Sequence, residues 1–345
     1  MPALGHRRSL APAAAESALP LDTAERPSCA GFEKPRSYYL PPQAGQKGQM
    51  MDPGIRERLD TLVSKGIAYR QRYEFIDDLK WPDGARIAVN FTADFDAMLY
   101  RRILNEPALQ LAKGEFGGRV GIWRLIELFD SHAIKATIFT PGRICELYPQ
   151  ALRQAVAGGH ELADHMWEHR VPREADLEAD HLKKALAALT AIRGKPVAGT
   201  RSGHTNSLLK QSGIIYKSDN SAGHLPHYIA DRTGKNTLLN LPFHYAIDDA
   251  QFYTFGWLGS DGPAQRMSDP DRVLEMWWAA FLQQYNKGGY LNVCLHPYVS
   301  GRALRIEMLD QLIRRMKGLP GVWFSTCEET ATWCLKHFPA RRLTS

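Results

Sequence analysis

Two aspartates, Asp94 and Asp96, flank Phe95 at the end of an apolar run, residues 87–91. In a strand, side chains two positions apart point to the same side, so both carboxylates would converge where the strand opens into a loop. One carboxylate can bind a metal ion while the other accepts a proton from water that the ion activates. The alternative is an ordinary exposed or capping pair of aspartates at the start of a loop.

Two histidines, His165 and His169, follow another predicted strand with a separation of four residues. This spacing lets two imidazoles reach one ion from a helical turn or a tight loop. The stretch also matches H-x-x-E-H, the spacing of inverted zinc peptidases, in which Glu168 would be the base. That alternative needs a long helix, whereas Pro172 follows closely, and it leaves the two aspartates without a role.

Arg201 and His296 each stand at the end of a further predicted strand. A guanidinium there can hold and orient an aspartate through two parallel hydrogen bonds, although an ordinary surface ion pair is the alternative. A histidine fixed by the following Pro297 can protonate a leaving amine, although a buried structural histidine would show the same pattern.

The elements that must position these residues alternate between short apolar runs and helical patterns from residue 86 onward, which predicts βα units around a parallel sheet. Seven or eight such units favour a barrel, in which chemistry is expected at the carboxyl ends of the strands. No P-loop and no G-x-G-x-x-G after a strand is present, which argues against phosphate-cradling cofactors. The predicted strands are 86–93, 135–140, 161–165, 197–201, 214–218, 238–245, 290–296 and 322–326, and the predicted helices are 119–132, 148–157, 177–193, 269–285 and 303–319.

The composition is ordinary for a soluble globular protein, with 44% hydrophobic and 23% charged residues among 345. The net charge of +6 comes from scattered basic residues, so we expect no nucleic-acid partner. No apolar run is long enough to span a membrane, and five cysteines without a C-x-x-C pair argue against a disulfide framework. We therefore expect a cytoplasmic protein with no membrane partner.

The chain is expected to contain one large domain with short additions. Residues 1–50 hold seven of the 21 prolines and no sustained periodicity, which predicts a flexible or extended arm, either a plain tail or a segment that wraps a neighbouring subunit. Residues 51–80 are predicted as a helical lead-in, 81–338 as the barrel, and 339–345 as a C-terminal tail.

With these motifs in this order, residues 80–338 resemble the polysaccharide deacetylase (NodB-homology, carbohydrate esterase 4) family. The branch that they resemble holds peptidoglycan deacetylase-like proteins, allantoinases and cyclic imidases. The resemblance implies a deformed α/β barrel of seven or eight units in a single domain. The supporting stretches are residues 81–86, 118–125, 241–244 with Asp248-Asp249, and 296–302.

Carried over position by position, the resemblance implies a metal-dependent hydrolase of non-peptide carbon–nitrogen bonds. Asp96, His165 and His169 would bind the ion, zinc by default with manganese, iron or cobalt as alternatives. Asp94 would be the general base tethered by Arg201, and His296 the general acid. The residues expected around the substrate are Trp167, His204, His244 and Tyr298.

The resemblance leaves the substrate open. An N-deacetylase of an amino sugar or small N-acyl compound is expected first, and a ring-opening hydrolase of a cyclic amide or imide is nearly its equal. A non-catalytic binding barrel would predict loss of Asp94 or of a histidine ligand, and both are present. Relatives in this branch are commonly tetrameric, so the resemblance also implies a homo-oligomer.

Overall fold

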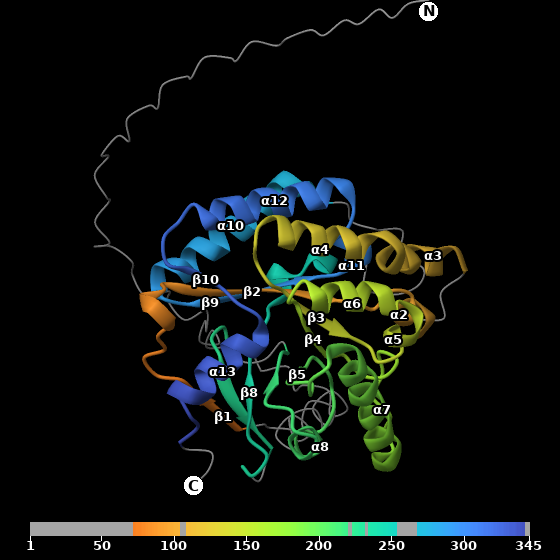
Figure 1. Ribbon diagram of the computed structural model, residues 1–345. Coiled ribbons are helices and arrows are strands. Elements are labelled where there is room, and N and C mark those ends of the chain that lie inside the picture. The colour runs from red at the N-terminus through yellow and green to blue at the C-terminus, as the bar shows by residue number, and fades with distance from the viewer. Residues whose placement is uncertain (1–71, 104–107, 220–222, 232–233, 254–267, 342–345) are drawn as a thin grey trace, which may run out of the picture. The chain divides into compact units, whose positions relative to one another are not determined.

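The computed structural model describes residues 72–103, 108–219, 223–231, 234–253 and 268–341 (Figure 1). All of these residues belong to one compact unit, Thr61–Ser345. The predicted arm, residues 1–50, lies outside the described residues, as do residues 51–71 of the predicted lead-in and residues 342–345 of the tail.

The described residues form a ten-stranded mixed sheet, with the order β1-β7-β8-β6-β5-β4-β3-β2-β10 and with β9 paired to β2. All of its ladders are parallel except those of β7 with β1 and β8. The sheet curls back on itself, since Asn292 of β9 donates a hydrogen bond to the carbonyl of Leu241, which follows β8. The strands are β1 Arg72–Phe75, β2 Ile87–Asp94, β3 Thr137–Thr140, β4 Glu161–Asp164, β5 Gly199–Thr200, β6 Tyr216–Lys217, β7 His227–Ala230, β8 Leu238–Asn240, β9 Tyr290–Leu295 and β10 Val322–Phe324. The eight predicted strands are all present, and the predicted deformed α/β barrel is confirmed.

Two strands were not predicted, and one of them corrects the helical lead-in. Residues 72–75 form β1, which pairs antiparallel with β7, Phe75 opposite His227. Tyr73 and Phe75 lie on the same face of β1 and stack on each other at 6.4 Å between ring centroids. Alternating aromatic residues favour a strand, and the partner strand that stabilises it comes about 150 residues later, beyond the reach of local pattern.

Helices cover the outer face of the sheet, as the alternation along β2 requires. Val89, Phe91 and Ala93 point outward into the cluster built with α4, α10 and α12, which lie together on one side of β2 (Figure 1). The five predicted helices are present as α4 Ile122–Ser131, preceded by a π-helical turn at Gly117–Gly121, α6 Pro149–Ala157, α7 Ala175–Arg193, α10 Pro270–Lys287 and α12 Ala303–Lys317. The further helices are α2 Leu99–Ile103, α3 Ala108–Phe116, α5 Ile144–Leu147, α8 Asn206–Gln211, α9 Asp249–Tyr253, α11 Pro297–Ser300 and α13 Cys327–His337, with 3-10 turns at Pro82–Gly84 and Tyr245–Ile247.

Helix α13 packs on the inner face of the curled sheet, at the end where the strands begin. Its Cys327, Ala331 and Cys334 are buried in one cluster with inward residues of the strands, such as Ala88 and Phe139. A capping box starts this helix: Thr326 accepts from the backbone N–H of Glu329, whose carboxylate accepts from the N–H of Thr326. The inner cluster therefore fills the barrel at the amino ends of the strands. Polar side chains that point inward lie at the carboxyl ends.

Among the described helices, none combines the length and apolar character needed to cross a membrane. The four cysteines of the described residues, Cys145, Cys294, Cys327 and Cys334, are unpaired thiols.

Candidate active site

The candidate site lies at the carboxyl ends of the parallel strands, where β2, β4, β5 and β9 bring their last residues together. Directly after β2, Phe95 is fully buried in a second apolar cluster with residues of α4, α6 and α7, while Asp94 and Asp96 lie on the opposite side. The register sets Ala93 beside Leu295 of β9 and Asp164 of β4 beside Thr200 of β5. The next residues, His296, His165 and Arg201, therefore follow directly at the same edge.

His165 and His169 lie on a tight loop after β4, and the loop contains left-handed residues. Met166 has φ 70° and His169 has φ 61°, values that cost energy in non-glycine residues and often mark functional loops. This loop rules out the inverted zinc peptidase interpretation, which needs a helix. Glu168 instead points to two arginines, 3.0 Å from Arg102 and 3.8 Å from Arg143.

The imidazole of His165 has a defined tautomer because its Nδ1 contacts the backbone carbonyl of Arg201. A carbonyl oxygen can only accept, so Nδ1 carries a proton, and Nε2 is the nitrogen left to face a ligand or an ion. That Nε2 lies 3.4 Å from Asp96 Oδ1, and Nε2 of His169 lies 3.5 Å from the same oxygen. Orientation of a ligand histidine through its other nitrogen is a common feature of metal sites.

These three residues fit a divalent metal ion. Asp96 is 2% exposed, and its Oδ1 is buried without a hydrogen-bond partner, which is costly unless a cation contacts it. Burial would raise the pKa of Asp96, but the two histidines hold it well below its ordinary value. Donors about 2.1 Å from an ion at a tetrahedral angle lie roughly 3.4 Å apart, which matches the observed separations.

Asp94 is held by Arg201, as predicted, but through one hydrogen bond and not through two parallel ones. Nη1 of Arg201 donates to Asp94 Oδ1 at 2.6 Å, which leaves Oδ2 facing His165 Nε2 at 3.9 Å. The guanidinium is 4.2 Å from the ring centroid of Phe139 of β3 and 4.4 Å from that of Phe243, which follows β8. Burial would lower the pKa of Arg201, but Asp94 raises it, so the guanidinium stays charged. Its further hydrogen-bond partners are Thr92, Ser218 and Cys294.

His296 is oriented by Asp249, a residue to which the sequence interpretation assigned no role. Its Nδ1 lies 2.7 Å from Asp249 Oδ1, and its backbone N–H donates to Oδ2 of the same carboxylate at 2.9 Å. Burial would lower the pKa of His296, but Asp249 and then Asp248 raise it to about 10. An acidic pair shortly after a predicted strand is the signal that could have identified this role.

The four predicted substrate contacts divide into two that the structure corrects and two that it leaves near the site. Trp167 is buried under α7, with the ammonium of Lys184 4.0 Å from its ring centroid. His204 is also buried against α7, with Nδ1 3.2 Å from Glu178. Neither ring is free to contact a substrate, because the loops after β4 and β5 turn these side chains to the outer face of the sheet.

Tyr298 and His244 remain compatible with a role near the substrate. The ring of Tyr298 meets that of His296 edge-on, 5.7 Å between centroids. His244 is exposed, its Nδ1 accepts from the N–H of Ala246, and its ring lies 5.5 Å from that of His224. The side chain of Cys294 also reaches the site, from β9, although the sequence analysis did not predict it. Its Sγ is 3.8 Å from Asp94 Oδ2.

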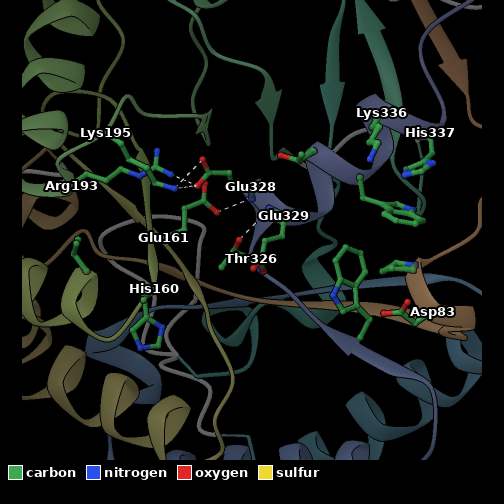
Figure 2. A pocket seen from close by; sticks show the side chains of 16 residues that line it. Asp83, His160, Glu161, Arg193, Lys195, Thr326, Glu328, Glu329, Lys336 and His337 are labelled. Carbon is green, nitrogen blue, oxygen red and sulfur yellow. Dashed lines mark hydrogen bonds and ion pairs between the residues drawn. The ribbon is translucent and has the colours of Figure 1, made fainter.

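A large pocket of about 700 Å³ lies away from these residues, at the amino ends of the strands (Figure 2). It is lined by the first residue of β4, Glu161, and by residues of α13 such as Glu328, which pairs with Arg193 and Lys195. Two of the cations here, Arg193 and Lys195, are therefore neutralised by the same carboxylate, Glu328. The converging donors at the carboxyl ends of the strands, and not the size of this pocket, mark the candidate active site.

Comparisons with known proteins agree with this geometry. The family model for polysaccharide deacetylase matches residues 117–207, which include His165, His169 and Arg201. A peptidoglycan deacetylase from Helicobacter pylori is 27% identical over 266 residues, 67% of this chain and 89% of that protein. Two solved structures are similar: one assigned as a polysaccharide deacetylase from Mycobacterium smegmatis has a TM-score of 0.70 and 26% identity over 79% of this chain and 97% of that one. The second, the Puue allantoinase, has a TM-score of 0.66 and 25% identity over 76% of this chain and 94% of the allantoinase chain.

Proposed function

The chain belongs to the polysaccharide deacetylase family, and from this premise we propose that it is a metal-dependent N-deacetylase of an amino sugar or another small N-acyl compound. Enzymes of this family are hydrolases that act on carbon–nitrogen bonds other than peptide bonds. The observation that carries the proposal is the buried, unpartnered Oδ1 of Asp96 with two imidazole Nε2 atoms within 3.5 Å of it.

Asp96, His165 and His169 would hold the ion, and zinc suits a set of two nitrogens and one oxygen. A divalent ion bound there supplies Lewis acidity, which polarises the amide carbonyl and makes a water molecule more acidic. The residues themselves must position the substrate and move protons.

Asp94 is placed to accept the proton of the attacking water. Arg201 occupies its Oδ1, so Oδ2 is the oxygen that faces the histidines and is available for that proton. The guanidinium and its aromatic neighbours fix the carboxylate before the substrate binds, which saves the reorganisation that water would otherwise require.

His296 is placed to protonate the departing nitrogen. Asp249 holds its Nδ1, so Nε2 is the nitrogen left for the substrate. With a pKa of about 10, the imidazole is protonated at neutral pH and can give its proton to the amine as the carbon–nitrogen bond breaks.

A ring-opening hydrolase of a cyclic amide or imide is the second candidate, favoured by the structural similarity to the Puue allantoinase. The same residues would serve, because a ring amide also needs an activated water and a protonated leaving nitrogen. The two functions differ in the product, which is acetate and a free amine in one case and a single opened chain in the other.

The test pairs elemental analysis of the purified protein with hydrolysis of an N-acetylglucosamine oligomer and of succinimide. We expect about one metal ion per chain and acetate release from the oligomer, both lost in His165→Ala. Glu168→Gln is the matched control, since Glu168 lies in the same loop but pairs with arginines. Turnover of succinimide alone would select the second candidate, and no metal under any loading would reject both metal-dependent functions.

A further inference from the structure

A second group of potential metal ligands lies beside the candidate site. One donor atom from each of Asp94, Cys294 and His296 lies within 4.8 Å of the others. The reaction proposed above uses two of these residues and leaves the thiol of Cys294 without a role. We propose that the three side chains form a second cation site, selective for thiophilic divalent ions such as zinc or cobalt, whose occupation inhibits the enzyme.

Each of the three residues keeps one donor atom pointed at this site. Cys294 and His296 are two positions apart at the end of β9 and so point to the same side. Asp94 gives Oδ1 to Arg201 and keeps Oδ2, which is 3.8 Å from the sulfur of Cys294. His296 gives Nδ1 to Asp249, and its Nε2 becomes a ligand once a cation displaces the proton that it carries at neutral pH. The set is one sulfur, one nitrogen and one oxygen, a combination that zinc binds readily.

The charges around this group favour a cation. Four buried carboxylates, Asp94, Asp96, Asp248 and Asp249, surround it. The fixed positive charge in direct contact is Arg201, whose Nη1 lies 3.2 Å from the sulfur. An ion at Asp96 would still leave three carboxylates against this guanidinium and the protonated imidazole of His296. A second cation is electrostatically supported because His296 loses its charge as the cation binds.

The sulfur determines which ions can use the site. Burial, and then Asp94, raise the pKa of the Cys294 thiol well above its ordinary value, so the thiol is protonated until a cation displaces the proton. Binding therefore forms one metal–sulfur bond and one metal–nitrogen bond, and it releases two protons to solvent, one from the thiol of Cys294 and one from the protonated imidazole of His296. Thiophilic ions gain enough from a thiolate to drive this exchange, whereas manganese prefers oxygen ligands and does not.

The inhibitory consequence rests on the proposed function, because it requires Asp94 and His296 to be the base and the acid. An ion held by Oδ2 of Asp94 and Nε2 of His296 occupies the two atoms that would move protons. Zinc is therefore expected to activate at the first equivalent and to inhibit at the second.

The experiment titrates metal-free protein with cobalt and follows bound metal by equilibrium dialysis and the near-ultraviolet thiolate-to-cobalt charge-transfer band. We expect the band to appear with the second equivalent in the wild type and in Cys334→Ala, whose cysteine is buried in the inner cluster. In Cys294→Ala the band should be absent and the second ion bound more weakly, by more than the roughly 10- to 100-fold cost of losing an outer-shell partner. Manganese should bind at the first site only, as one equivalent per chain.

The proposal is overturned if Cys294→Ala binds the second cobalt ion as tightly as the wild type, or if the wild type shows no thiolate band at excess cobalt. Neither measurement needs a substrate. They therefore test the second site even if the protein proves not to be a deacetylase. Loss of the first ion in His165→Ala, with the band retained, would keep the two sites separate. A second site that binds cobalt without slowing hydrolysis would instead remove the roles of Asp94 and His296.

Discussion

The two ends of the parallel strands both bury carboxyl groups, but they surround them differently. At the amino end, Glu161 accepts from the hydroxyl of Tyr216 at 2.7 Å, and from the hydroxyl of Thr137 and the N–H of Glu328 at 2.8 Å each. At the carboxyl end, Asp96 is equally buried, yet its Oδ1 has no hydrogen-bond partner.

This difference separates a structural carboxyl from one that awaits a ligand. Glu161 ties the first turn of α13 to the sheet, where the unpaired N–H groups of a helix start favour an acceptor. Asp96 faces two imidazoles, with Nε2 of His165 at 3.4 Å and Nε2 of His169 at 3.5 Å from its Oδ1. Burial alone does not separate Glu161 from Asp96. The large pocket of Figure 2 would place the active site at the amino ends of the strands, away from Asp96. The two carboxyl groups differ in whether their oxygen atoms have hydrogen-bond partners.

The largest effect is expected from His165→Ala at the carboxyl end. It removes one of the three proposed ligands, so bound metal should be lost and hydrolysis should fall by more than about 100-fold, exceeding the effect of an outer-shell change. Metal analysis and acetate release measure both. Unchanged metal content would mean that Asp96 is a structural carboxyl after all, and that the comparison between the two ends fails.

Asp94→Asn should slow hydrolysis by roughly 100- to 10,000-fold, the usual contribution of a general base, while metal content stays unchanged. The amide keeps the shape and can still accept from Arg201, so the protein should remain folded. Steady-state kinetics with metal analysis on the same sample provide the measurement. Full activity would show that another group accepts the proton.

Asp249→Asn should lower kcat and move the basic limb of the pH profile. Asp249 raises the pKa of His296, so neutralising it lowers that pKa from about 10. An acid must be protonated to act, and activity is lost as pH rises through its pKa; the limb should therefore shift to lower pH. A lower kcat with an unmoved limb would indicate that another group is the acid.

Glu161→Gln, at the amino end, should leave hydrolysis unchanged and alter only the pH dependence of stability. Burial raises the pKa of Glu161 from 4.5 to about 7, so the folded state holds a proton that the unfolded state releases. Its stabilising contribution, about 3 kcal/mol, is present below pH 4.5 and is lost as pH rises towards 7. Denaturant unfolding across this range should show the slope in the wild type and a smaller one in the variant. A fall in activity with stability unchanged would contradict the structural role.

Local pattern was enough to place most of the elements and the core of the site. The alternation in residues 87–94 predicted both the strand and the side on which Asp94 and Asp96 point, because a strand has a period of two. The four-residue histidine spacing was consistent with one ion, but not with a unique backbone. The peptidase alternative and the metal-binding loop fit the same residues, 165–169. Pro172 argued against the helix that the peptidase needs, and the turn with left-handed Met166 and His169 excludes it.

What the sequence by itself determined is therefore the alternation of strands and helices, the order of the polar residues at strand ends, and the chemistry available to them. Tertiary structure decided which atoms are satisfied. It turned Trp167 and His204 against α7, brought Asp249 to His296 across 47 residues, and placed Cys294 beside Asp94 across 200. The physical reason is that the face and exposure of a side chain in a loop, and its partner in a distant strand, depend on packing that no local period encodes.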